Sequence, residues 1–159
     1  IQKVFWNEQK GFFFDYNYRE EKQTDSISAA GFVPLFVKAA TAQQATEGVS
    51  KVLFTDLLAW GGVNTTTVQN HQQWDSPNGW APLQWFAVQG FKNYNLPHHK
   101  AITERWISMI QQRFARDKKL LEKYDVVNID KHAGGGEYGV QEGFGWTNGV
   151  TLEFLKSNS

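Results

Sequence analysis

Apolar residues recur at helical spacing in the second half of the chain. One run of them, between residues 80 and 94, consists of Leu83, Ala87, Gly90, Phe91 and Tyr94. A second run, between residues 97 and 119, consists of Ile102, Trp106, Met109, Ile110 and Phe114. Steps of three and four residues predict two amphipathic helices. The short link around Asn95 and Pro97 indicates that these helices are antiparallel neighbours.

Weaker helical patterns occur before and after this pair. Pro34 suits the first turn of a helix that runs to about residue 40. Thr41 is a good N-cap for the next helix, and its apolar face would contain Ala42, Ala45, Val49, Val52 and Leu53. A last helix is predicted over residues 147–156. Residues 1–28 have little periodicity and predict irregular structure after a helix or a short strand.

Two long segments interrupt the helical pattern. Residues 59–78 and 122–149 are rich in aromatic and glycine residues, and loops of this length are often functional. No segment shows convincing strand alternation. The sequence therefore predicts an all-α fold in which helical hairpins are joined by long Gly- and aromatic-rich loops. A length of 159 residues indicates a single domain over residues 1–159.

Charge and cysteine content exclude several classes of protein. Sixteen Lys and Arg residues balance sixteen Asp and Glu residues, which argues against a nucleic-acid partner and against attraction to an anionic membrane. The chain has no Cys, so disulfides and thiolate metal sites are excluded. The four His residues lack partners at metal spacing, and we expect no metal or cofactor. The absence of Cys suits either the cytoplasm or the periplasm of a bacterium.

The aromatic content is high for so polar a chain. Twelve Phe, seven Trp and five Tyr accompany a mean hydropathy of -0.50. Most of these rings are expected to fill the core. The remainder predict a ligand site with flat walls, because an indole face can cover the apolar face of a sugar ring.

The first long loop combines such rings with polar side chains. Gln73, Trp74, Asp75, Asn78 and Trp80 lie within eight positions before a predicted helix. Carboxylates and amides bind sugar hydroxyls, and indoles stack on the ring. Asp75 and Asn78 have an alternative role as helix N-caps, which local composition alone favours.

The second long loop carries two candidate catalytic carboxylates. Hydrolysis of a glycosidic bond normally needs two carboxyl groups flanking the bond. Glu122 and Glu137 are the candidates, and the alternative for Glu122 is a solvated residue near a helix end. The glycines at 134–136 precede Glu137 and allow a close backbone approach.

Several long motifs together resemble those of the trehalases, glycoside hydrolase family 37. Residues 73–82 (QWDSPNGWAP) resemble the second signature of that family. Residues 122–126 (EKYDV), 134–138 (GGGEY) and 141–150 (QEGFGWTNGV) resemble its C-terminal segment, and residues 14–17 (FDYN) also agree. The resemblance covers nearly the whole chain in order.

The resemblance implies an (α/α)6 barrel that hydrolyses α,α-trehalose to glucose with inversion of configuration. Glu122 then corresponds to the general base and Glu137 to a glutamate that contacts the sugar. The residues implied to form or close the sugar pocket are Gln73, Trp74, Asp75, Asn78, Trp80, Tyr138, Phe144 and Trp146. Lys131, His132 and Ala133 precede only three glycines, a shorter run than is usual in the family.

The resemblance also implies that the chain is the C-terminal part of a catalytic domain, about two of the six helical hairpins. The family's first signature, its substrate-binding arginines and its aspartate general acid all lie upstream of the motifs present here. We therefore expect trehalose or glucose as ligand and no useful activity of the chain alone. We also expect self-association, driven by an apolar stripe at Ile102, Trp106, Ile110 and Phe114 that the excised piece would expose.

Two other functions stay open at the level of sequence. One is a non-catalytic sugar-binding module that has kept the aromatic and carboxylate residues. The other is a different (α/α)6 glycosidase with another α-glucoside as substrate.

Overall fold

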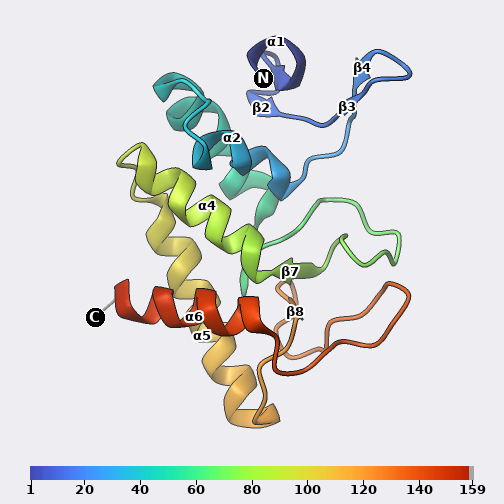
Figure 1. Cartoon of the computed structure of the whole chain (residues 1–159), viewed down its shortest axis with the longest axis vertical. Coiled ribbons are helices and arrows are strands. Elements are labelled where there is room, and N and C mark those ends of the chain that lie inside the picture. Colours follow the sequence, from blue (N-terminus) through green and yellow to red (C-terminus); the bar gives the residue numbers. More distant parts are fainter. Residues whose placement is uncertain (158–159) are drawn as a thin grey trace.

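Three long helices form the body of the molecule. The computed structural model describes residues 1–157. The helices are α4 (Ala81–Asn93), α5 (His98–Asp117) and α6 (Gly145–Ser157), and α4 packs against both of the others (Figure 1). Their bounds lie close to the predicted ones, and the expectation of a helical fold is confirmed. Within residues 1–157, no helix combines the length and apolar character that a membrane crossing requires.

The upstream helical segments are shorter and less regular than predicted. The segments are a 3-10 turn η1 (Ala29–Phe32), α2 (Val33–Phe36), a π-type turn η2 (Gln44–Val49), α3 (Ser50–Val52) and a second π-type turn η3 (Leu53–Leu57). Thr41 caps the second group as predicted. Its hydroxyl accepts the Gln44 N–H at 3.1 Å, and the Gln44 side chain accepts the Thr41 N–H at 2.8 Å. This reciprocal pair is a capping box, which stabilises the start of the segment.

The described part of the chain contains four pairs of short antiparallel strands that were not predicted. After α1 (Gln2–Phe5), the first three pairs are β1 (Trp6–Asn7) with β2 (Phe12–Phe13), β3 (Tyr16–Asn17) with β4 (Lys22–Gln23), and β5 (Leu58–Ala59) with β6 (Gly62–Val63). A strand of two residues is too short to show a period of two, so the sequence carries no signal for it.

The prediction of an exposed apolar stripe that drives self-association is wrong at three of its four positions. Ile102, Trp106 and Ile110 are buried, because α5 packs against α4, α6 and β6. Phe114, which was also predicted to face the core, is 48% exposed near the end of α5. The chain thus covers most of this helix face itself. Self-association stays a prediction, without the stripe as its cause.

The fourth strand pair joins the two long loops. β7 (Asn78–Trp80) pairs with β8 (Lys123–Asp125), and Gly79 lies opposite Tyr124. A Cβ at Gly79 would lie 2.3 Å from Cγ1 of Val126, so glycine permits this close packing. Figure 1 shows both loops projecting from the same side of the helices. The pairing brings the two segments predicted to be functional into contact.

Candidate active site

Glu122 is in contact with three other predicted site residues, Gln73, Tyr138 and Trp146. It directly precedes β8 and is 0% exposed. Its carboxylate accepts hydrogen bonds from Gln73 Nε2 and from the Tyr138 hydroxyl, each at 3.4 Å. Its backbone N–H donates to the carbonyl of Gln141 at 2.9 Å, and its carbonyl accepts the Trp146 indole N–H at 3.1 Å. The alternative of a solvated surface glutamate is therefore wrong.

An aromatic cluster adjoins Glu122 through Trp146, whose indole N–H donates to the Glu122 carbonyl. The rings of Trp74 and Trp80 are stacked, with centroids 4.0 Å apart and an interplanar angle of 7°. The Trp146 ring is edge-on to both of these rings. The ring centroids of Phe144 and Trp146 are 4.5 Å apart. Trp80 is 1% exposed whereas Trp74 is 47% exposed. Trp80 is thus the buried member of the cluster, and Trp74 is its exposed member.

Asp75 and Asn78 do not cap α4, so that alternative is also wrong. The N-cap position is held by Trp80, and no side chain caps the helix there. The buried Asp75 carboxylate accepts the backbone N–H groups of Asn70 at 2.5 Å and Gln72 at 3.0 Å. The Asn78 amide donates to the carbonyl of Gly134 at 2.9 Å. Both side chains stabilise the loops rather than the helix.

The glycine run lies directly against the first loop. Gly135 and Gly136 have φ values of 78° and 90°, where other residues are strained. A Cβ at Gly136 would lie 1.7 Å from Gln73 Oε1, so no larger residue fits there without movement. The Gly136 N–H donates to the carbonyl of His71 at 3.0 Å. The next residue, Glu137, is exposed on the loop and is thereby accessible to a ligand.

Lys123 is a site residue that the sequence did not single out. It is 0% exposed, and its ammonium donates to Gln73 Oε1 and to the carbonyls of Gly134 and Gly135. The ammonium also lies 5.5 Å from the Trp80 ring centroid. A single lysine in a strand of three residues gives no sequence pattern that would indicate burial. Only the tertiary structure shows which groups surround it.

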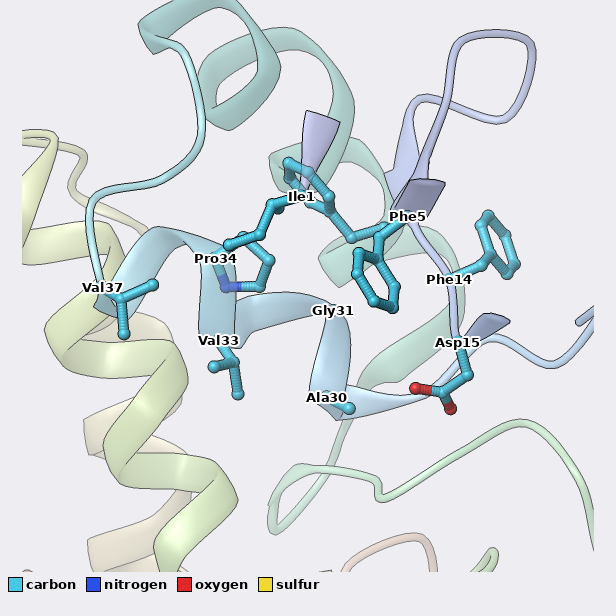
Figure 2. Close-up of a pocket in the computed structure, with 10 residues that line it drawn as sticks. Ile1, Phe5, Phe14, Asp15, Ala30, Gly31, Val33, Pro34 and Val37 are labelled. Carbon is cyan, nitrogen blue, oxygen red and sulfur yellow. The ribbon is translucent and has the colours of Figure 1, made fainter. Parts of the chain in front are cut away.

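A separate apolar hollow lies at the N-terminal end of the molecule. It has a volume of about 290 Å³ and lies between α1, β2 and α2, with Phe5, Phe14 and Pro34 in its wall (Figure 2). Asp15 is also on the wall of this hollow. None of the residues that contact Glu122 lines the hollow. The hollow is therefore separate from the contacts around Glu122.

Replacing Trp80 with alanine is expected to lower the free energy of unfolding by about 3–5 kcal/mol, because a buried ring is lost and a cavity remains. Trp60→Ala is the matched control, since Trp60 is 75% exposed. Urea titration followed by circular dichroism measures both variants. Equal unfolding midpoints for the two variants would show that Trp80 does not stabilise the aromatic cluster.

Comparison with known proteins agrees with the resemblance of the motifs. The family model described as trehalase matches residues 1–159. A periplasmic trehalase of Escherichia coli O17:K52:H18 is 46% identical over 157 residues, which cover 98% of this chain and 27% of that protein. The chain therefore spans about a quarter of the length of this relative.

Solved structures show the same arrangement of elements. The neutral trehalase Nth1 from Saccharomyces cerevisiae superposes with a TM-score of 0.80 at 33% identity, over 98% of this chain and 28% of that one. A GH63 mannosylglycerate hydrolase from Thermus thermophilus superposes with a TM-score of 0.68 at 18% identity, over 96% of this chain and 35% of that one. At so low an identity the second likeness concerns the fold alone.

Proposed function

The chain belongs to the trehalase family, and we propose that it forms the C-terminal part of an (α/α)6 catalytic domain that hydrolyses α,α-trehalose to glucose with inversion. The observation that carries this proposal is the buried Glu122 carboxylate, which lies among side chains of both long loops. We infer the substrate from the family membership, and we infer the catalytic role of Glu122 from its contacts.

Glu122 acts as the general base in this proposal. A base that activates water must be held in a fixed position beside the reacting atoms. Gln73 and Tyr138 each donate a hydrogen bond to the Glu122 carboxylate and hold it in place. Tyr138 belongs to the exposed glycine-rich loop, so a shift of this loop would admit the attacking water. The second carboxyl group, the general acid, comes from outside residues 1–159.

Trp74 stacks on one glucose ring in this proposal, because nearly half of its surface is exposed although Trp80 covers one face. Glu137 binds sugar hydroxyls from the opposite loop. Phe144 and Trp146 close the aromatic wall. Asp75 and Asn78 contribute indirectly, since their side chains already hold the loops in place.

The stereochemistry of the products tests the proposal. The full-length protein that contains this chain is incubated with trehalose, and early products are followed by proton NMR. Inversion at one anomeric carbon is expected to give one β-glucose from the attacked ring and one α-glucose from the leaving group. Retention would give only α-glucose at early times and would contradict the proposal.

Two further measurements separate the alternatives. Calorimetric binding of trehalose by the full-length protein without turnover would replace the proposal with a sugar-binding module. Faster turnover of another α-glucoside, in a panel of disaccharides, would replace it with a different glycosidase of this fold.

A further inference from the structure

The ammonium of Lys123 has a complete set of acceptors in the interior. It lies 3.1 Å from Gln73 Oε1, 2.9 Å from the Gly134 carbonyl and 3.0 Å from the Gly135 carbonyl. A lysine ammonium has three N–H donors and no acceptor. All three donors are therefore used, which is the condition under which a buried charge is tolerated.

This ammonium determines how the Gln73 amide is oriented. Because Lys123 only donates, the oxygen of the amide must face it. The nitrogen of the amide then faces the other way and donates to Oε1 of Glu122. One glutamine side chain thus connects the buried cation with the proposed base, and the cation decides which end of the amide meets the carboxylate.

The charges around Lys123 are consistent with its connection to Glu122 through Gln73. Burial lowers the pKa of the Lys123 ammonium, and the negative charges of Glu122 and Asp75 oppose that shift. The phenol of Tyr138, on the glycine-rich loop, is a titratable group that donates to the Glu122 carboxylate. Replacing Lys123 with a neutral residue removes this positive charge from the neighbourhood of Glu122.

We propose that Lys123 is a positioning residue for Glu122: it holds the amide N–H2 of Gln73 against the carboxylate and pins the glycine run to the first loop. The inference rests on the proposed function for the base role of Glu122. The contacts with Gly134 and Gly135 do not depend on that role. Lys123 itself touches no reacting atom.

The test compares Lys123→Met with Lys119→Met in the full-length protein. Lys119 is the matched control, because its ammonium is exposed and pairs with the exposed Glu142 carboxylate, at 2.5 Å. Lys123→Met is expected to lower kcat about 10- to 100-fold, the loss typical of hydrogen bonds to a charged group. It is also expected to move the acidic limb of the pH–rate profile to higher pH. Lys119→Met is expected to leave both unchanged.

Hydrogen exchange gives a readout that does not need turnover. Amides of residues 134–138 are expected to exchange faster in Lys123→Met and at the wild-type rate in Lys119→Met, since the two hydrogen bonds from Lys123 to the carbonyls of Gly134 and Gly135 are lost. Wild-type exchange together with an unmoved acidic limb would overturn the inference. An inactive wild-type protein would contradict the proposed function, whereas the exchange data would still decide the role of Lys123.

Two more variants cover a failure of Lys123→Met to fold. Lys123→Gln keeps an N–H donor but removes the charge, and its acidic limb is expected to move in the same direction. Gln73→Glu still offers an acceptor to the Lys123 ammonium but places a second carboxylate beside Glu122. The acidic limb of the pH–rate profile is therefore again expected to move to higher pH. An unmoved limb in both variants would overturn the inference.

Discussion

Purified by itself, the chain of 159 residues is expected to release glucose from trehalose at least about 10²–10⁴-fold more slowly than the full-length protein, the usual contribution of one general acid. The chain supplies the proposed base, Glu122, and one aromatic wall. The family resemblance implies that the acid and the substrate-binding arginines lie upstream. A missing acid raises the barrier by about 3–5 kcal/mol, and lost positioning of the sugar adds several more.

The measurement is glucose release at equal molar concentrations of chain and full-length protein. Far-UV circular dichroism shows whether the chain alone keeps its helices, and an upstream segment purified separately is then added to the folded chain. Recovered activity in the mixture is expected if the two parts reassemble. Turnover near the full-length rate by the chain alone would place both carboxyl groups within residues 1–159, with Glu137 or Asp75 as the second.

The helices could be predicted from sequence because their signal is local. The spacing of Ala87, Phe91, Trp106 and Ile110 gave α4 and α5 to within about two residues at each end. Phe114 has the same spacing but is exposed. Periodicity reports which residues share a helix face, whereas burial also depends on how far the neighbouring elements extend along that face.

The site could be predicted only in part, because its geometry depends on contacts between distant segments. The motifs led to Glu122 and to the tryptophans, and β7 and β8 do bring these together. The local rule for helix caps failed at Asp75, since the extended Trp80 holds the N-cap and Asp75 lies five residues earlier. Lys123 was missed because its acceptors come from residues 73, 134 and 135, which no local pattern connects to it.

Glu122→Gln in the full-length protein is expected to lower kcat by about 10²–10⁴-fold, the range for one acid–base group. The amide has nearly the shape of the carboxylate and keeps an oxygen acceptor, but it cannot take a proton from water. Binding of trehalose is therefore expected to stay close to wild type in calorimetry. The matched control is Glu137→Gln, for which weaker sugar binding with a smaller change in kcat is expected.

Azide separates loss of the base from general disruption of the site. Glu122→Ala leaves space beside Gln73 and Tyr138, and a small anion can enter where the attacking water would be activated. Azide needs no base, because it attacks the anomeric carbon without giving up a proton. The expected product is β-glucosyl azide together with one α-glucose, at a rate that rises with azide concentration. Unchanged turnover of Glu122→Gln would assign the base role to another residue, with Glu137 tested next, and an α-glucosyl azide product would contradict the inverting mechanism.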